Sequence, residues 1–99
     1  MARLTASERE SLDRAVLVAL LSRCDEATYV IRNILDWPGK PFHRKGLLTS
    51  DILRACRRLE KKALIAEGRS QYAIMKTWRI TPAGRLALEQ SDRDGGRDG

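Results

Sequence analysis

Apolar residues recur every four positions near the start of the chain. Leu12, Val16 and Leu20 share one face of a helix predicted over about residues 7–22. A Ser or Thr followed three residues later by Glu has the spacing of a capping box, which satisfies the free N–H groups at a helix start. Two such pairs precede the apolar run: Ser7 with Glu10 and Thr5 with Glu8. The chain is therefore expected to open with a helix.

A second helix is predicted over about residues 26–36, where apolar residues again recur at helical spacing. The Pro-Gly pair at 38–39 ends this helix, because proline and glycine disfavour helical continuation. Two prolines and two glycines fall within residues 37–48, which are predicted to form a loop. Trp37 and Phe42 bracket this loop and are expected to anchor it.

A third helix is predicted over about residues 50–62, with Thr49 or Ser50 as its N-cap. At 100° per residue, its apolar and polar side chains separate onto two faces. The apolar face holds Ile52, Ala55, Cys56, Leu59 and Ala63. The polar face holds Ser50, Asp51, Arg54, Arg57, Arg58 and Lys61. One face can be buried while the other presents a basic strip.

A β-hairpin is predicted next, because a short apolar segment at 64–66 precedes a turn-like stretch and a run of β-forming residues. Its tip lies near 68–72 and its second strand extends to Ile80. Trp78 is expected to pack this hairpin on the helices rather than to stack on a ligand, since large aromatic residues are usually buried.

A last, short helix is predicted from Thr81, its cap, to about Gln90, with Pro82 in the first position. The order of three helices, a two-stranded hairpin and a short C-terminal helix is that of a winged helix-turn-helix domain, a mainly α (α+β) fold. Residues 1–91 are assigned to this domain. Residues 92–99 contain no apolar side chain and are expected to form a disordered, charged tail.

The charge is concentrated in one part of the chain. Its 99 residues hold 19 Lys and Arg against 13 Asp and Glu, a net charge of +6. Residues 38–62 alone hold eight basic and two acidic side chains. A basic patch of this kind fits a polyanion.

Several other functions find no support in the residues. Two cysteines and one histidine are too few for a disulfide framework or a Cys/His zinc site, so no metal or cofactor is expected. The longest apolar run, residues 15–21, is too short to cross a bilayer. No nucleophile or phosphate-loop motif indicates an enzyme. A cytoplasmic location, away from membranes, is expected.

A double-stranded DNA interface is the interpretation that best fits the basic strip. In a DNA-reading helix the N-terminal residues reach base edges and others contact phosphates. Ser50, Asp51 and Arg54 are then candidates for base edges. The remaining helix candidates are Thr49, Arg57, Arg58 and Lys61, and the loop adds Lys40, Arg44 and Lys45 as phosphate contacts.

Three segments resemble those of bacterial winged helix-turn-helix transcriptional regulators of the PadR and MarR type. Residues 48–65 resemble the recognition helix and first wing strand, with an "R-x-L-E-x-x-G-L-I"-like run at their end. Residues 78–88 resemble the "L-T-x-x-G-R-x-x-L" segment, in which the second wing strand enters a helix. Residues 17–32 are similar to the opening of PadR-type regulators. The resemblance implies a DNA-binding regulator or repressor, and adds Arg69 and Gln71 at the wing tip as DNA contacts.

The chain departs from this pattern in two places. Ala63 stands where these regulators usually have Gly after the recognition helix. Only about ten helical residues are expected after Thr81, so the long C-terminal dimerisation helix of PadR-type proteins is missing. A homodimer is then expected to use the first helix or the short last one.

Two alternatives stay open. In one, the fold is a protein–protein interaction module whose basic face binds an acidic partner. In the other, the same face binds RNA, with Trp37 and Phe42 as stacking platforms.

Overall fold

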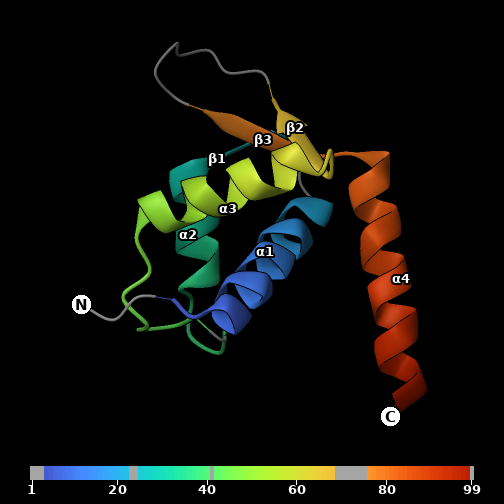
Figure 1. The fold of residues 1–99 in the computed structure, drawn as a ribbon. Coiled ribbons are helices and arrows are strands. Elements are labelled where there is room, and N and C mark those ends of the chain that lie inside the picture. Colours follow the sequence, from blue (N-terminus) through green and yellow to red (C-terminus); the bar gives the residue numbers. More distant parts are fainter. Residues whose placement is uncertain (1–3, 23–24, 41, 69–75, 99) are drawn as a thin grey trace.

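A computed structural model describes residues 4–22, 25–40, 42–68 and 76–98 (Figure 1). These residues form four helices and three short strands. They are α1 (Ala6–Leu21), β1 (Glu26–Ala27), α2 (Thr28–Leu35), α3 (Thr49–Lys61), β2 (Ile65–Glu67), β3 (Thr77–Ile80) and α4 (Pro82–Asp98). The three helices and the β2–β3 hairpin confirm the predicted winged-helix arrangement.

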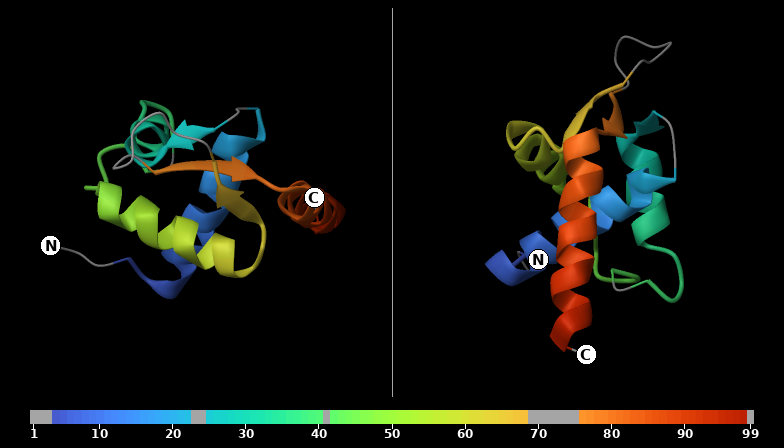
Figure 2. Two further views of the ribbon diagram at one scale, coloured as in Figure 1. Left: turned by 90° about the horizontal axis from the view of Figure 1, so that it is seen from above. Right: turned by 90° about the vertical axis from the view of Figure 1, so that its right-hand side faces the viewer.

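The core lies where α1, α2 and α3 pack against one another and against the sheet (Figure 2). Each helix contributes its predicted apolar face, including Leu12, Ile31 and Ile52, all fully buried. Trp78 of β3 is also fully buried, and its indole Nε1 donates a hydrogen bond to Thr28 Oγ1 at 3.0 Å. The expectation that Trp78 packs the hairpin on the helices is confirmed.

The sheet has one more strand than the sequence predicts. Its order is β1-β3-β2, and both pairings are antiparallel. Glu26 lies opposite Trp78 in one pairing, and Ile65 lies opposite Ile80 in the other. Residues 26–27 were expected to begin the second helix, which in fact starts at Thr28. A two-residue strand is too short to show a period of its own, and only its pairing with β3 makes it a strand.

The capping residues of α1 and α4 are among those that the sequence predicts. At α1 the capping box is Thr5 with Glu8, not Ser7 with Glu10: Thr5 N donates to Glu8 Oε1 at 2.9 Å, and Glu8 N donates to Thr5 Oγ1 at 3.1 Å. At α4, Gly84 N donates to Thr81 Oγ1 at 3.1 Å, which confirms Thr81 as the cap.

The turn after α3 has a left-handed residue, Ala63, at the position where glycine is usual in the regulators that this segment resembles. Ala63 has a φ of 61°, in the left-handed region. Leu64 N donates to Leu59 O at 3.0 Å and Ala63 N donates to Glu60 O at 2.9 Å. These two bonds form a Schellman motif, which closes a helix when the residue after the C-cap is left-handed. Ala63 thus adopts a conformation that glycine takes readily, at a cost of about 1–2 kcal/mol for a residue with a Cβ.

The start of α4 packs on the turn before β2 with no room for a side chain. A Cβ on Gly84 would lie 2.2 Å from the backbone oxygen of Leu64 and 2.7 Å from Ile80 Cγ1. The backbone of Leu64 also accepts a hydrogen bond from Thr81 N at 3.0 Å. The glycine of the 78–88 segment is thus needed for this close approach.

The last helix is longer than the sequence predicts. It was expected to end near Gln90, with a disordered tail over residues 92–99, but α4 continues to Asp98. Gly95 and Gly96 lie in this predicted tail, and each glycine lowers the stability of a helix by about 1 kcal/mol relative to Ala. Extending an existing helix is easier than nucleating a new one. The domain boundary at residue 91 stays a prediction.

Phe42, Trp37 and Cys56 differ in burial. Phe42 is buried and anchors the 37–48 loop as expected. Trp37 is 65% exposed, so its predicted anchoring role is wrong; it follows the C-cap of α2, on the side away from the core. Cys56 is fully buried, and burial raises the pKa of its thiol to about 12. Cys56 is therefore a packing residue.

We expect the Gly84→Ala substitution to lower the free energy of unfolding by about 1–3 kcal/mol, because backbone must move to admit the methyl group. In an unconstrained helix the same change stabilises by about 1 kcal/mol. Urea unfolding followed by circular dichroism decides between the two signs. A stabilised variant would show that α4 does not approach Leu64 this closely.

Candidate nucleic-acid interface

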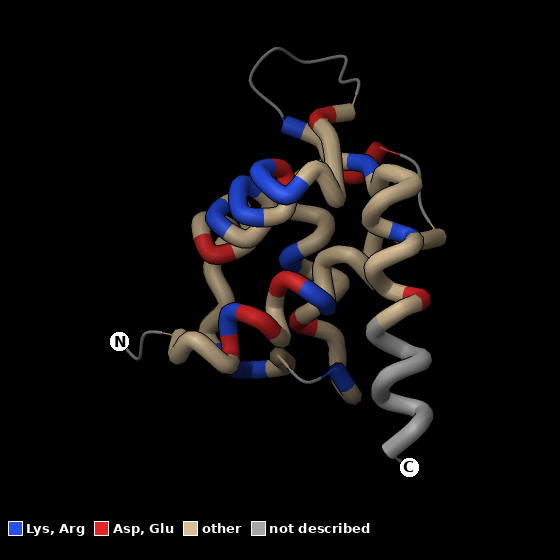
Figure 3. Tube along the Cα trace, turned by 45° about the vertical axis from the view of Figure 1, so that its right-hand side comes forward, with Lys and Arg blue, Asp and Glu red and all other residues tan. Residues whose placement is uncertain are grey.

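The α3 helix buries one face and exposes a row of cations on the other. Ile52, Cys56 and Leu59 are buried against the core. Arg54, Arg57 and Lys61 are exposed and lie three and four residues apart, so they form one stripe along the helix. The Arg54 side chain is 69% exposed. Figure 3 shows this run of basic residues on α3. The predicted division of the helix into two faces is confirmed, with two exceptions: Ala63 lies beyond the end of α3 and is exposed, and Arg58 turns inward.

Asp51, a predicted base-edge contact, accepts a hydrogen bond at the N-terminus of α3. The N-cap is Leu48, not Thr49 or Ser50, and Leu48 N donates to Asp51 Oδ2 at 2.9 Å. The other carboxylate oxygen of Asp51 lies 3.4 Å from Arg54 Nη1. Both oxygens of Asp51 are thus engaged within the helix. Thr49 and Ser50 are exposed.

Arg58 differs from the other cations of α3, because it turns inward to α1. Its Nη2 donates to Asp13 Oδ1 at 2.7 Å and its Nε donates to Oδ2 at 3.0 Å. The Asp13 side chain is 13% exposed and the Arg58 side chain 33%. The hydrogen bond to Asp13 raises the pKa of the Arg58 guanidinium. A buried carboxylate needs such a partner, so Arg58 joins α3 to α1 and is not an outward-facing cation.

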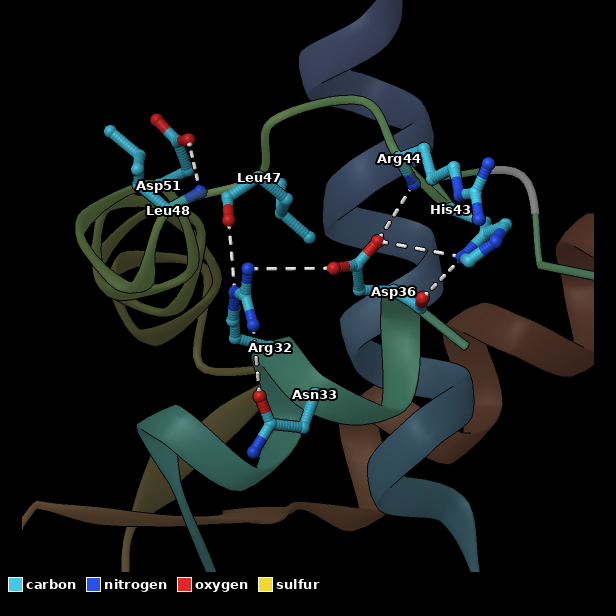
Figure 4. A network of polar contacts seen from close by, with 8 residues as sticks. All are labelled: Arg32, Asn33, Asp36, His43, Arg44, Leu47, Leu48 and Asp51. Carbon is cyan, nitrogen blue, oxygen red and sulfur yellow. Dashed lines mark hydrogen bonds and ion pairs between the residues drawn. The ribbon is translucent and has the colours of Figure 1, made fainter. Parts of the chain in front are cut away.

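A polar network fixes the loop that leads from α2 into α3 (Figure 4). Arg32 Nε donates to the backbone oxygen of Leu47 at 2.9 Å, and Arg32 Nη2 lies 3.4 Å from Asp36 Oδ2. Asp36 Oδ1 accepts from the backbone N of Arg44 at 2.8 Å. His43 Nδ1 donates to the backbone oxygen of Asp36 at 2.7 Å.

The network holds the loop by its backbone and leaves its cations outside. Arg44 has a left-handed φ of 58°, which the bond from its N–H to Asp36 stabilises. The side chains of Lys40, Arg44 and Lys45 are exposed. All three predicted loop cations are thus available to a ligand.

The wing lies beside the same surface. The guanidinium carbon of Arg57 sits 5.8 Å from the centroid of the Trp78 ring, a cation–π contact that links α3 to β3. Lys76 pairs with Glu67 across the hairpin, and this contact lowers the pKa of Glu67. Arg79 pairs with Asp25 at 2.8 Å. Arg69 and Gln71, the predicted wing-tip contacts, lie outside the described residues.

Five of the predicted residues border one open depression of about 410 Å³ at the N-terminal ends of α1 and α3. They are Lys45, Ser50, Asp51, Arg54 and Arg58. The depression is also lined by Arg9 of α1, which the sequence analysis did not identify. Arg9 lies in a segment of mixed charge, beside Glu8 and Glu10, so no local signal distinguishes it.

In the described part of the chain, no group of three or more His, Cys, Asp or Glu is placed to hold a metal ion. None of the helices in those residues is long and apolar enough to cross a membrane.

Several solved structures have a similar fold. A transcriptional regulator from Clostridium thermocellum has a TM-score of 0.75 and 21% identity, over 98% of this chain and 91% of that chain. A PadR family transcriptional regulator from Eggerthella lenta has a TM-score of 0.70 and 22% identity, over 89% and 74%. ZitR from Lactococcus lactis, a zinc-responsive MarR family member, has a TM-score of 0.63 and 13% identity, over 97% and 56%.

No family model and no curated protein matches the sequence. The structural similarities confirm the winged-helix fold and the resemblance to PadR- and MarR-type regulators. The first two of these neighbours are transcriptional regulators.

We expect Arg58→Ala to destabilise the fold, because it leaves the Asp13 carboxylate unpaired. The expected loss is about 2–3 kcal/mol, below the ~3–5 kcal/mol of a fully buried pair, since Arg58 is one-third exposed. Replacing both partners, as Asp13→Leu with Arg58→Met, should recover most of the loss. Urea unfolding of the three proteins measures both effects. A single variant as stable as the wild type would show that the pair does not hold α3 on α1.

Proposed function

We propose that this protein is a sequence-specific regulator of transcription that binds double-stranded DNA with α3 in the major groove. The observation that carries the proposal is the exposed stripe of Arg54, Arg57 and Lys61 on a helix whose other face is buried. The 13 residues of α3 span about 20 Å, and the major groove is about 12 Å wide and admits a helix. The regulator fold supports the same assignment.

The stripe is open to an external anion because its internal pairs are weak. Arg54 lies 3.4 Å from Asp51, and Arg57 lies 3.4 Å from Glu60. Exposed pairs of this kind contribute about 0–1 kcal/mol. A DNA phosphate or a guanine edge can therefore replace them at little cost.

The roles of the individual residues follow from their positions. Arg54 and Ser50, near the N-terminus of α3, face the base edges, and Arg54 can contact guanine O6 and N7. The phosphate contacts are Arg57, Lys61, Lys40, Arg44 and Lys45, with Thr49 at the helix start and Arg69 and Gln71 on the wing. Asp51 acts chiefly as the cap, and Arg58 as the link to α1.

Such a protein can repress by occupying a promoter. A symmetric pair of reading helices would then match a palindromic site. We infer that the homodimer forms through α1 and α4, which contact each other. Exposed apolar side chains lie on both helices: Val18 (48%), Leu21 (39%) and Leu86 (54%). These side chains become buried on association.

The binding proposal predicts a steep dependence on salt. If six to eight cations neutralise phosphates, the log–log slope of affinity against salt should be roughly −5 to −7 between about 50 and 200 mM. Arg54→Ala/Arg57→Ala should flatten the slope by about 2. Fluorescence anisotropy with a random-sequence duplex measures both quantities.

The control is Arg85→Glu on α4, which changes the net charge by the same two units at a residue outside the α3 stripe, the loop and the depression. This variant should keep the wild-type slope. Absence of duplex binding at low salt would reject the DNA proposal and favour an acidic protein partner for the basic face.

The dimer proposal predicts that Leu86→Glu shifts the protein toward the monomer. A charge in the buried contact lacks a partner and opposes association. Sedimentation velocity across a concentration series measures the shift, with Tyr29→Glu on the exposed face of α2 as the control. A wild-type protein that stays monomeric at all concentrations would overturn the dimer.

A further inference from the structure

A second group of cations lies at the N-terminal end of α3. Arg9 from α1, Lys45 from the loop and Arg54 from α3 border the depression described above. These residues come from three elements and lie far apart in the sequence. Tertiary packing alone has therefore placed three positive charges around one opening of about 410 Å³.

The positive charge of this opening is only partly balanced. Arg58 is neutralised by Asp13 at 2.7 Å, and Asp51 is engaged with Leu48 N and Arg54. Arg9 and Lys45 have no carboxylate within ion-pair distance in the described part of the chain. Lys45 acts on Glu8 only through its field, as a minor cause of the low pKa of that carboxyl, after the two hydrogen bonds with Thr5. Two cations thus remain for an external anion.

The opening also has the chemistry to orient a phosphate oxygen. The exposed hydroxyl of Ser50 lies on its rim and can donate a hydrogen bond. Arg9 can donate two parallel N–H bonds to one phosphate, a geometry that fixes position as well as charge. The Asp51 carboxylate, which would repel an anion, is already committed to the cap.

The position relative to α3 indicates which phosphate would enter. A helix in the major groove is bordered by the two sugar–phosphate backbones, which lie on either side of it. The wing is joined to α3 through Arg57 and Trp78, at one border of the stripe. The depression lined by Arg9 lies at the N-terminal end of α3. The two features can therefore contact different backbone segments.

We propose that Arg9 and Lys45 bind a phosphodiester group of the DNA backbone that borders α3 at its N-terminal end. The proposal rests on the proposed function and deepens it, because it extends the DNA interface from α3 and the loop onto α1. Arg9 fixes how deeply α3 enters the groove, since backbone contacts set position without reading sequence.

The first test compares Arg9→Ala with the single-charge control Arg85→Ala on α4 by anisotropy against salt. Arg9→Ala should reduce the slope by about 1 and weaken duplex binding, and Arg9→Lys should retain most of the slope. Arg85→Ala should match the wild type. If Arg54→Ala/Arg57→Ala flattens the slope but Arg9→Ala does not, this inference fails and the proposed function stands. If the wild type shows no salt-dependent binding, both fail.

The second test identifies the phosphate. In a duplex selected for tight binding, each phosphate is replaced in turn by a neutral methylphosphonate. One position should weaken wild-type binding and leave Arg9→Ala unaffected, because the two changes remove the same contact. Binding of pyrophosphate that requires Arg9, with every methylphosphonate acting equally on wild type and Arg9→Ala, would instead assign the opening to a free anion and overturn the proposal.

Discussion

The contact between Asp13 of α1 and Arg58 of α3 sets the orientation of the basic helix. The Asp13 carboxylate is nearly buried and accepts its hydrogen bonds from one guanidinium. Breaking such a pair leaves an unpaired charge in the protein interior, which disfavours other rotations of α3. Adjacent residues differ by about 100° around a helix. With Arg58 turned toward α1, Arg57 faces the wing and Arg54 faces solvent.

The ends of α3 are held by contacts of a different kind. At the N-terminus, Asp51 caps the helix and Arg32 binds the carbonyl of Leu47, so the entry of the chain is determined. At the C-terminus, the Schellman turn at Ala63 leads directly to Leu64, whose carbonyl meets Gly84. The proposed binding mode needs both ends of α3 in place, because a small tilt would move the exposed stripe away from the bases.

The cations differ in how closely they are paired. Arg58, Arg79 and Lys76 each contact a carboxylate, those of Asp13, Asp25 and Glu67. The outward-facing cations of α3 and those of the loop make only long pairs or none among the described residues. Like charges held together on one surface repel one another, and a polyanion relieves that repulsion. This contrast is the electrostatic basis of the proposed DNA interface, and it places Arg9 and Lys45 within it.

The sequence by itself determined the features that depend on near neighbours. The helical spacing of apolar residues predicted α1, α2 and α3, and Thr81 was predicted as the cap of α4. The helical period of α3 placed Cys56 on the buried face and Arg57 on the exposed face. Local patterns could not show that Glu26 lies opposite Trp78 in the sheet or that Arg58 forms an ion pair with Asp13. They also could not show that Arg9 lines the same depression as Lys45 and Arg54. Each of these contacts joins residues distant in the sequence, and the partner is chosen by packing. Spacing along a helix determines which face a side chain occupies, and the tertiary structure alone decides what that face meets.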